Sequence, residues 1–591
     1  MIRNKYFEML ENEKIMSFYI NLNKDASISK KISTDDLSAL NDISLIYVYA
    51  NERRTEYYIG QTNTLVRRHN EHLREKKGNS LKYQNHFGKG TLMVFYGEKI
   101  AHNLNYIENS LIKIFKDWEI DHNILTLNST EGNKSSYFQQ SREMVDFDVI
   151  ESILKSLVQN RMLKFSPNIS KDSLKAILYR NSPFFELYEN QKRVMKDILT
   201  GSEDIFIIRG GAGTGKTVLL NNIVAKLIKE NNRNLDSKNK TLKIGVCFKN
   251  NMLKSFAGIF RSYEPDLGRY KVKIENYLDL IRRIYNKKYD YIFVDEAHRL
   301  LQYDDDLFPK ASRIFLENYN CENVLNLLMR HSKKLVLFYD DKQSIRKTDI
   351  EDIGTKGNYS STYNFSGKKI YDETLKLQYR IRPLSFQRET DIECANGFII
   401  YIKYMLQQKN LSELGNLEFL QTDYFGICDS LKELKDYYND KTRKFPFKRT
   451  AIIAGLSRKH DKKGNEQKGE LAWKEIEMGW NKNNEKWATS GDFSKEVGTI
   501  HSVQGYDFDY VGVIVGKDLI YQNNKVSIDR DNYFDNKGKK GCDDEMLEKF
   551  IKNIYYTLLT RGIYGIRIYI EDDALREYWK KKTEELRKYT K

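Results

Sequence analysis

Short apolar runs alternate with helical stretches from about residue 200 to the end of the chain. Four of these runs precede residue 345 and at least three follow residue 450, so the pattern predicts two sheets in two lobes. Runs of this kind suit parallel strands that are buried on both faces of a layered α/β fold. The runs are IFIIR (205–209), KIGVCF (243–248), YIFVD (291–295), KLVLFYD (334–340), AIIAG (451–455), YVGVIVG (510–516) and IRIYI (566–570).

The N-terminal part of the chain follows another pattern. Residues 46–60 predict a hairpin of two strands, IYVYA and EYYIG, joined by the loop NERRT. A third strand is expected at 91–98, and a helix at about 103–117, because the apolar residues there fall on one helical face. Residues 129–145 are polar and predict a linker, whereas residues 1–40 carry no motif that indicates a role.

Composition narrows the class of protein without identifying it. Lys and Arg number 98 against 82 Asp and Glu, and the resulting charge of +16 points to an anionic partner such as nucleic acid. The abundance of Lys, Asn, Ile and Tyr is also what an A/T-rich genome would produce, so charge alone does not decide. The five cysteines show no CxxC spacing, which predicts a reducing cytoplasm rather than a disulfide framework or a cysteine zinc site. No apolar run reaches the roughly 18 to 20 residues of a membrane span, and we expect no secretory signal at the start.

The strand at 205–209 runs directly into GGAGTGKT, residues 210–217, which matches the phosphate-binding pattern G-x-x-x-x-G-K-[ST]. Glycines in such a loop let backbone N–H groups turn onto phosphate oxygens, and the next helix adds positive potential at its N-terminus. Lys216 is expected to reach the β- and γ-phosphates of ATP, and Thr217 is expected to bind Mg²⁺. The glycines assigned to this nucleotide site are Gly210, Gly213 and Gly215.

A second apolar strand ends in the carboxylate pair of YIFVDEAH. Asp295 can hold Mg²⁺ through water, and Glu296 can polarise the attacking water. Acidic strand ends are common by themselves, but in combination with the phosphate-binding loop this one predicts a nucleoside triphosphatase.

Further segments between about 184 and 572 resemble the superfamily-one helicases, and more closely the ATPases grouped with Schlafen-type helicase domains. The resemblance implies a motor with two RecA-like lobes, and FKNNML (248–253) would touch single-stranded DNA. The segments that carry it, in order, are FKNNML, YDDKQSI (339–345), LQYRIRP (377–383), GTIHSVQGYDFDYVGVIVG (498–516) and TLLTRG (557–562).

The resemblance implies nucleotide contacts in both lobes. Gln191 sits where the family reads adenine, and Asp340 and Gln343 would sense the γ-phosphate, although Tyr339 replaces the usual glycine. Gln504 and Gly505 form the QG pair of the fourth segment, in which Asp507 stands where Glu is usual.

The same resemblance implies two arginine fingers from the second lobe. Arg380 is our choice for the first, with Arg382 as the alternative, and Arg561 is the second. Such arginines stabilise charge in the transition state of phosphoryl transfer.

Two motifs near the N-terminus resemble those of the GIY-YIG endonucleases. The first reads Leu45-Ile46-Tyr47, so its initial glycine is missing, while the second, Tyr58-Ile59-Gly60, is intact. In that family a divalent metal on a glutamate activates the scissile phosphate, and a motif tyrosine helps to deprotonate water. The resemblance makes Tyr47 the base candidate and Tyr58 its neighbour.

Other residues complete the resemblance. Arg68 occupies the family position of the catalytic arginine, and His72, four residues later, shares its helical face. Glu108 matches the metal-binding glutamate, and Asn128, with Asn123 as the alternative, matches a late asparagine that helps to bind phosphate.

Glu108 is unusual even without the family. It is four residues after Leu104 and three before Leu111, on the apolar stripe of its own helix. A carboxylate at such a position is costly unless it is paired or coordinates a metal, although a glutamate that reaches outward to solvent is the ordinary alternative. His69 and His72 could suggest a metal pair, but without further ligands at suitable spacing zinc is disfavoured.

Together these patterns predict an α/β multidomain protein in which a small α+β GIY-YIG nuclease domain precedes two RecA-like parallel-sheet lobes. The expected divisions are a segment of unknown role (1–40), the nuclease domain (41–130), a linker and helical region (131–183), the first lobe (184–375) and the second lobe with inserted helices (376–591).

The expected function is an ATP-dependent helicase or translocase coupled to a metal-dependent endonuclease that cleaves DNA, in defence against phage or other foreign DNA. The expected cofactors are ATP and Mg²⁺ or Mn²⁺, and the expected partner is nucleic acid, with DNA favoured over RNA and no membrane. The alternatives are a DNA-repair nuclease-helicase, an RNA-directed enzyme, and a nucleotide-gated binding switch that does not unwind. Neither the oligomeric state nor a protein partner can be inferred from the sequence.

Overall fold

The computed structural model divides the described part of the chain into two compact units. The first unit contains the described residues up to Leu163, and the second contains those from Leu187 onward. The described residues are 7–10, 15–28, 41–74, 83–101, 104–128, 147–163, 187–236, 241–248, 272–276, 279–280, 288–302, 317, 321, 323–350, 352–363, 365–378, 380–381, 391–445, 448–458, 472–484, 486–490 and 492–589.

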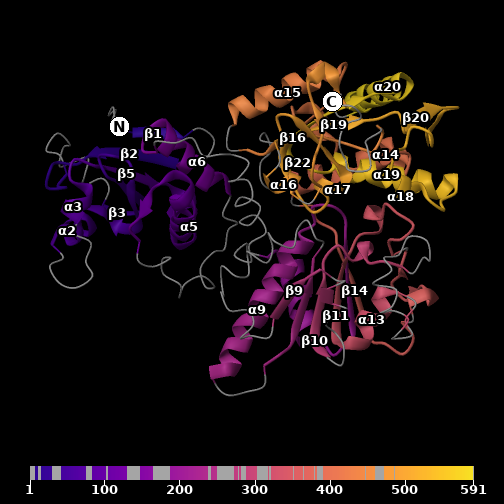
Figure 1. The fold of residues 1–591 in the computed structure, drawn as a ribbon, viewed down its shortest axis with the longest axis horizontal. Coiled ribbons are helices and arrows are strands. Elements are labelled where there is room, and N and C mark those ends of the chain that lie inside the picture. Colours follow the sequence, from indigo (N-terminus) through magenta and orange to yellow (C-terminus); the bar gives the residue numbers. More distant parts are fainter. Residues whose placement is uncertain are drawn as a thin grey trace. The chain divides into compact units, whose positions relative to one another are not determined.

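The first unit is built on a mainly antiparallel sheet with the strand order β1-β2-β5-β3-β4-β6 (Figure 1). Its strands are β1 (Phe7–Leu10), β2 (Ile15–Asn21), β3 (Asn41–Ala50), β4 (Glu56–Thr64), β5 (Thr91–Tyr96) and β6 (Leu125–Thr126). Its helices are α2 (Leu65–Arg74), α3 (Tyr83–Phe87), α4 (Glu98–Ala101), α5 (Leu104–His122) and α6 (Phe147–Gln159).

The predicted hairpin, third strand and helix of this unit are confirmed. β3 and β4 pair antiparallel, β5 pairs with β3 on its other side, and β4 pairs with β6 in parallel. α5 extends five residues beyond the expected end at 117. The first 40 residues, which had no assigned role, contribute β1 and β2 to the same sheet, because β2 pairs antiparallel with β5. The linker expected at 129–145 lies outside the described residues.

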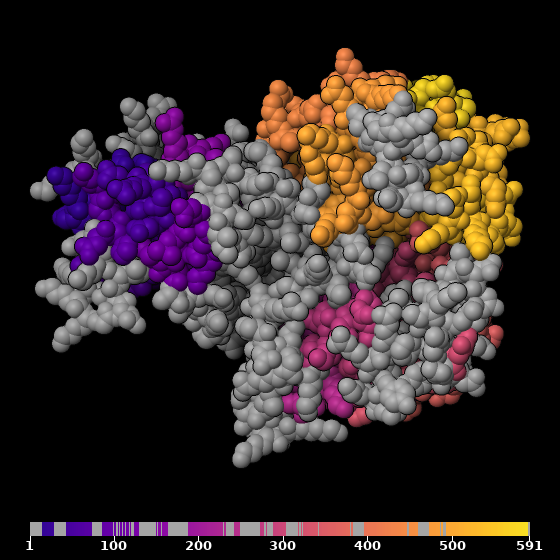
Figure 2. Space-filling model, viewed as in Figure 1, coloured from indigo at the N-terminus to yellow at the C-terminus, as the bar shows by residue number. Residues whose placement is uncertain are grey.

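The second unit holds two six-stranded parallel sheets, which confirms the predicted pair of lobes. The first-lobe sheet has the order β14-β7-β11-β10-β8-β9, and the second-lobe sheet has the order β15-β22-β19-β16-β18-β17. All seven predicted apolar runs are strands of these sheets. In this view the second lobe, orange to yellow, forms a closely packed body (Figure 2).

The first-lobe strands are buried because each face carries its own apolar layer. Phe206 and Ile208 of β7 face the side that packs against α9, while Ile205 and Ile207 face the side that packs against α13. The two helices lie on opposite sides of the sheet (Figure 1). The elements of this lobe are α8 (Glu189–Thr200), β7 (Ile205–Gly210), α9 (Lys216–Asp236), β8 (Ile244–Cys247), β9 (Val272–Glu275), β10 (Tyr289–Val294), η2 (Ala297–Arg299), α13 (Val324–His331), β11 (Ser332–Tyr339), η3 (Asp341–Gln343), β12 (Gly354–Thr355), β13 (Asn358–Tyr359), η4 (Ser361–Tyr363) and β14 (Ile370–Leu375).

The second lobe repeats this plan. The strand β19 is buried along its whole length between layers that include α15 and α19. The elements are α14 (Asp391–Met405), η5 (Leu411–Glu413), η6 (Glu418–Gln421), β15 (Phe425–Cys428), α15 (Leu431–Lys444), β16 (Thr450–Ala454), η8 (Lys474–Ile476), β17 (Gly479–Trp480), α16 (Trp487–Ser490), β18 (Glu496–Thr499), α17 (Ile500–Val503), β19 (Phe508–Val515), β20 (Leu519–Gln522), β21 (Lys525–Ile528), α18 (Asn536–Lys539), α19 (Asp544–Leu559), β22 (Gly562–Ile570) and α20 (Asp573–Tyr589). Among the described helices, none is both long and apolar enough to cross a membrane.

Candidate active sites

The phosphate-binding loop connects β7 to α9 at the carboxyl edge of the first-lobe sheet. Gly213 and Gly215 have φ angles of 80° and 77°, in the left-handed region that favours glycine. A Cβ on Gly210 would lie 2.4 Å from Thr214 Oγ1, and one on Gly213 would lie 2.1 Å from Gln378 Oε1. The loop therefore needs glycine at these positions for its own conformation and packing.

Lys216 and Thr217 begin α9 beside this loop. The buried Lys216 amino group donates to the carbonyls of Gly210 at 2.6 Å and Gly211 at 2.9 Å. Thr217 Oγ1 donates to Asp295 Oδ2 at 2.9 Å, so the loop hydroxyl meets the acidic end of β10. A hydroxyl and a carboxylate are oxygen ligands of the kind Mg²⁺ prefers, so this pair fits the expected metal.

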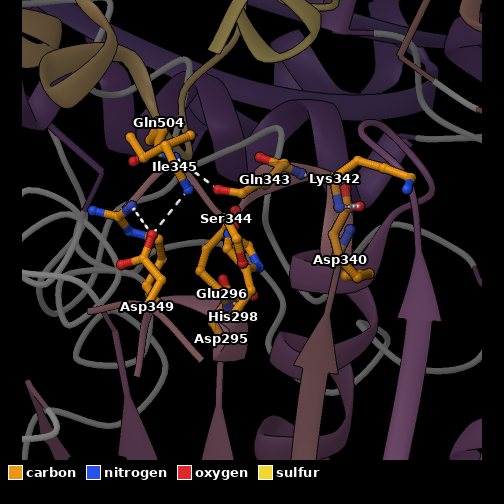
Figure 3. Close-up of polar contacts among 12 residues, drawn as sticks. Asp295, Glu296, His298, Asp340, Lys342, Gln343, Ser344, Ile345, Asp349 and Gln504 are labelled. Atoms are coloured by element: carbon orange, nitrogen blue, oxygen red, sulfur yellow. Dashed lines mark hydrogen bonds and ion pairs between the residues drawn. The ribbon is translucent and has the colours of Figure 1, made fainter. Parts of the chain in front are cut away.

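The acidic pair follows β10 in a strained turn (Figure 3). Glu296 has a φ of 50°, which is uncommon for a residue other than glycine and is typical of functional turns. His298 is fully buried, and its Nε2 lies 3.0 Å from Glu296 Oε2. Burial, helped by the charge of Glu296, raises the pKa of Asp295. Burial would also raise the pKa of Glu296, but contact with His298 and the charge of Lys216 lower it.

Asp340 and Gln343 lie after β11, at the same edge of the sheet as the phosphate-binding loop. Gln343 Nε2 donates to Asp340 Oδ2 at 2.6 Å, and Arg561 Nη2 donates to Gln343 Oε1 at 2.9 Å. Arg561 is fully buried, and burial together with the nearby charge of Arg380 lowers its pKa to about 10. The arginine of the second lobe therefore contacts the side chain expected to sense the γ-phosphate. Tyr339, which replaces a glycine, is buried in the apolar core.

Arg380 joins the same cluster through Asp507. Arg380 Nε lies 2.7 Å from Asp507 Oδ1, and Arg380 Nη1 donates to the Thr560 carbonyl at 3.1 Å. Arg561 Nη1 lies 3.9 Å from the same Asp507 oxygen. Arg382, and all of FKNNML except Phe248, lie outside the described residues.

Three glutamine side chains anchor the edges of the nucleotide site. Gln191 Nε2 donates to the Thr214 carbonyl at 3.3 Å, and Gln504 Nε2 donates to the Gln343 carbonyl at 3.4 Å. Gly505, next to Gln504, has a φ of 84°. The third, Gln378, was not expected: its Nε2 donates to the Ala212 carbonyl at 2.8 Å, inside the phosphate-binding loop. Its sequence signal was its place within LQYRIRP, as the second residue of that segment.

In the first unit, the two tyrosine motifs face each other across β3 and β4. Tyr47 is paired with Gly60 in the register, and a Cβ on Gly60 would lie 2.3 Å from Tyr47 Oη. The Tyr47 ring thus occupies the space that a side chain at position 60 would fill. Leu45, which stands where the motif has glycine, is fully buried in the apolar core of this sheet, so the departure is accommodated.

Tyr47 lies among the other predicted residues. Its hydroxyl is 3.1 Å from His72 Nε2 and is hydrogen-bonded by Arg68, and its ring centroid is 6.3 Å from that of Tyr58. Burial, with the nearby Tyr58, raises the pKa of Tyr47. Burial, with the charge of Arg68, lowers the pKa of His72 to about 3, so its imidazole is neutral at physiological pH.

Glu108 projects from α5 toward β4. Gln61 Nε2 donates to Glu108 Oε2 at 2.9 Å, and the Gln61 backbone N–H also bonds this carboxylate. Burial raises the pKa of Glu108, while these hydrogen bonds and the charge of Arg68 oppose the rise. Within the described residues no group of three or more His, Cys, Asp or Glu is arranged around a metal position. A single oriented carboxylate still fits a Mg²⁺ ion that keeps most of its water ligands. Gln61 was not predicted, because only the packing of α5 on β4 brings it to Glu108.

Asn128 and Asn123 differ in their surroundings. Asn128 Nδ2 donates to the Ile59 carbonyl at 2.7 Å, and its Oδ1 accepts from the Ile59 N–H at 3.0 Å. Its amide thus binds the backbone of β4 next to Gly60. Asn123 is exposed, and its φ of 50° follows the end of α5.

His69 has a partner of its own. Its Nδ1 lies 2.6 Å from Tyr49 Oη, and the two rings stack with an interplanar angle of 16°. Burial lowers the pKa of His69 to about 4. His69 and His72 therefore form hydrogen bonds with two different tyrosines.

Residues 203–572, more than half of the chain, match the family described as Schlafen group 3, DNA/RNA helicase domain. The chain belongs to this Schlafen helicase family. Residues 43–121 match the GIY-YIG catalytic domain. The expected combination of a GIY-YIG nuclease domain with two RecA-like lobes is therefore confirmed, and this Schlafen-type protein is a hydrolase of nucleic acids and nucleoside triphosphates.

One curated relative is the uncharacterized protein YPL245W of Saccharomyces cerevisiae, which is 29% identical over 402 residues. These residues are 63% of this chain and 83% of the yeast protein.

Solved helicases are more distant. An arterivirus nonstructural protein 10 helicase in complex with DNA has 10% identity and a TM-score of 0.28, over 65% of this chain and 64% of the viral one. The DUF1998 helicase MrfA bound to DNA and AMPPNP has 11% identity and a TM-score of 0.30, over 71% and 53%. Pif1 helicase from Candida albicans has 14% identity and a TM-score of 0.27, over 68% and 100%. The Schlafen-type chain thus spans less than two thirds of the viral and MrfA chains.

Proposed function

We propose that this protein is an ATP-driven translocase or helicase that brings DNA to its own metal-dependent endonuclease, in defence against phage or other foreign DNA. The observation that carries the proposal is the presence in one chain of two clusters of the predicted side chains. One surrounds the phosphate-binding loop and Arg561, and the other surrounds Tyr47 and Glu108.

In the proposed motor, the first lobe holds ATP and the second lobe completes the site. Thr217 and Asp295 would hold Mg²⁺, which would neutralise charge on the β- and γ-phosphates. Glu296, kept ionised next to His298, polarises the attacking water. Arg561 reaches the nucleotide side of the first lobe through Gln343, so each round of hydrolysis changes how the lobes hold each other.

In the proposed nuclease, Glu108 would hold a divalent metal, which would supply a Lewis acid for the scissile phosphate. Gln61 orients this carboxylate with two hydrogen bonds. Tyr47 takes the proton of the attacking water as its own proton passes to neutral His72, whose Nε2 is 3.1 Å away. Arg68, hydrogen-bonded to Tyr47, offsets the negative charge that develops on the phosphate.

Charge and cysteine chemistry support the proposed setting. The net charge of +16 favours binding to a nucleic-acid backbone. The described free cysteines, Cys247, Cys321, Cys428 and Cys542, are all buried thiols, which supports a reducing cytoplasm. Defence is proposed by analogy, because joining a motor to a nuclease suits an enzyme that must travel along long DNA before cutting it.

The test uses the full chain with a plasmid, a short duplex, a single strand and RNA, each with and without ATP and Mg²⁺. Cleavage and phosphate release are measured in parallel. We expect metal-dependent cleavage of DNA, and an effect of ATP on the plasmid but little on the short duplex, because only long DNA needs transport.

Lys216→Ala serves as the matched protein, since it should lose the effect of ATP on the plasmid and keep cleavage of the short duplex. Cleavage of RNA alone would refute the DNA assignment. Identical plasmid cleavage by both proteins in all conditions would show that the motor and the nuclease are uncoupled.

A further inference from the structure

The second lobe contacts a short segment of the first lobe, residues 343–346, which begins with the predicted γ-phosphate sensor Gln343 (Figure 3). Gln504 donates to the carbonyl of Gln343, and Asn553 Nδ2 donates to the carbonyl of Ser344 at 2.9 Å. Together with the bond from Arg561 to the Gln343 side chain, these contacts fix the segment from the second lobe. In two of the three contacts the acceptor is a backbone carbonyl of the first lobe, so these two contacts do not depend on which side chains the segment carries.

Arg346 adds a charged contact to these hydrogen bonds between the lobes. Its Nη2 donates to Asp535 Oδ2 at 2.9 Å, and it lies 2.7 Å from His501 Nε2. His501 Nε2 is itself 3.1 Å from the same Asp535 oxygen. Burial would raise the pKa of Asp535, but His501 and Arg346 hold it far below its ordinary range. Arg346 of the first lobe and Asp535 of the second lobe therefore form a partly buried ion pair between the two lobes.

Both ends of this ion pair are anchored in their own lobes. The other oxygen of Asp535 caps α18 by accepting from the N–H groups of Lys537 at 3.1 Å and Gly538 at 3.0 Å. The backbone N–H of Arg346 donates to Asp349 Oδ2 at 3.1 Å. Asp349, almost fully buried, also accepts from Arg299 at 2.6 Å.

Arg299 links this ion pair back to the acidic turn. It ends η2, the short helix that starts directly after Glu296. A continuous set of contacts thus runs from the turn that carries Glu296, through Arg299 and Asp349, to Arg346 and across to Asp535. A shift of Asp535 relative to the first lobe would be transmitted to the position of Gln343 and of its partner Arg561.

We propose that Arg346 and Asp535 are positioning residues for ATP hydrolysis. Their ion pair sets the register of the second lobe on the first, so that Arg561 meets Gln343 at the nucleotide. Both act on the nucleotide site indirectly, because Arg346 is the last residue of the segment 343–346 and Asp535 contacts that segment through Arg346. This inference rests on the ATPase part of the proposed function and adds two residues outside the predicted nucleotide site.

The experiment measures steady-state ATP hydrolysis and the binding of a fluorescent ATP analogue by the full chain. Variants are Asp535→Asn, Arg346→Gln and the double variant. We expect each single variant to lower kcat by about 10- to 100-fold with little change in analogue affinity, because small misplacements of a reacting group cost this much. We expect the double variant to be no worse than the singles, since both remove the same contact. Arg346→Lys should restore part of the rate.

Asp544→Asn is the matched control. Asp544 pairs with Arg530 at 2.8 Å in an exposed contact within the second lobe, so its loss should leave kcat unchanged. Cleavage of a short duplex reports whether each variant is folded and active elsewhere. A wild-type kcat in Asp535→Asn, or losses in the two singles that simply add in the double, would overturn the inference. A wild-type protein that hydrolyses no ATP would instead overturn the motor assignment itself.

Discussion

The two candidate sites of this protein are assembled in different ways. The nuclease cluster uses residues from a short stretch of chain, between Tyr47 and Glu108, held by adjacent strands and the helices packed on them. The motor cluster joins residues as far apart as Gln191 and Arg561, and the second lobe supplies part of it. The nuclease geometry is thus a property of one small sheet, whereas the motor geometry exists only while the two lobes hold each other.

This difference predicts which changes stay local. A change in the nuclease sheet should affect cleavage alone, and it should do so through close packing. A change at the lobe interface should reach the nucleotide from a distance. The following experiments are designed to break or sharpen that contrast.

Lys216→Ala should have the largest effect. Without the amino group that the loop positions at the phosphates, ATP hydrolysis should fall to background, while cleavage of a short duplex stays at the wild-type rate. Phosphate release and cleavage are measured on the same preparation. Normal hydrolysis by the purified variant would refute the assignment of the loop.

Glu108→Ala should have the mirror-image effect. Cleavage should be lost because the proposed metal loses its protein ligand, and ATP hydrolysis stimulated by nucleic acid should stay near wild type. Glu52→Ala, which removes an exposed carboxylate from the same unit, is the control and should change neither. If cleavage survives in Glu108→Ala, the metal is bound elsewhere.

Much of this fold follows from the sequence alone, and the reason is the burial of the strands. Parallel strands covered on both faces are continuous apolar runs, and all seven that we predicted exist. The strand β14 was not predicted, because its sequence, IYDETL, is not a continuous apolar run. It contains a buried charge, Asp372, which accepts from Arg209 Nε of the adjacent strand at 2.8 Å. The strand β2 was not predicted either, because its partner in the sheet, β5, lies about 75 residues further along the chain.

The sites show the same limit. Motif spacing identified Tyr47, Glu108, Lys216 and Arg561, which the structure brings into two clusters. Spacing gave no signal for residues whose partners are set by tertiary packing. Gln61 contacts Glu108 only because α5 packs on β4. The second-lobe hydrogen bonds to residues 343–346 form only because the two lobes pack against each other.

Arg561→Ala should slow hydrolysis by roughly 10³-fold or more, the scale of an arginine finger, with ATP binding largely kept. The contact with Gln343 at 2.9 Å places this guanidinium at the interface between the lobes. Single-turnover hydrolysis and analogue binding separate the two effects. An equal loss of binding and rate would indicate a role in holding the ground state.

Gly60→Ala should reduce cleavage by about 100-fold without touching hydrolysis. A Cβ there would lie 2.3 Å from Tyr47 Oη, so the ring must leave its present position beside His72, and misplacing a reacting group by about 1 Å costs this much. Gly415→Ala is the matched control, because a Cβ at that position meets nothing within 4 Å. Unchanged cleavage in Gly60→Ala would show that Tyr47 does not need its present position.

The smallest effect we predict is a pH dependence of stability confined to the nuclease unit. His69 and His72 are buried, with pKa values lowered to about 4 and about 3, so the folded state keeps them neutral while the unfolded chain protonates them below about 6.5. The unfolded state then binds more protons, so stability falls as the pH drops from 6.5 toward 4 and is fully present above 6.5. Each histidine should contribute a loss of about 1.4 kcal/mol per pH unit in that window.

His69→Phe should remove about half of this slope. It also removes the hydrogen bond between His69 Nδ1 and Tyr49 Oη, at a roughly constant cost of about 1 kcal/mol, so the slope and not the absolute stability is the informative quantity. The full chain is unfolded in urea at pH 7.0, 6.0 and 5.0, and the transition is monitored by pulse-labelling mass spectrometry. The quantity measured is the urea concentration at the midpoint of unfolding, read from peptides that cover α2. Peptides from β19 in the second lobe serve as the internal control, since the substitution lies in the other unit. A slope in His69→Phe equal to that of the wild type would mean that His69 takes up its proton in the folded state as readily as in the unfolded one. The nuclease sheet would then be more open to water than the close packing of Tyr49 on His69 implies, and its independence from the motor would need another explanation.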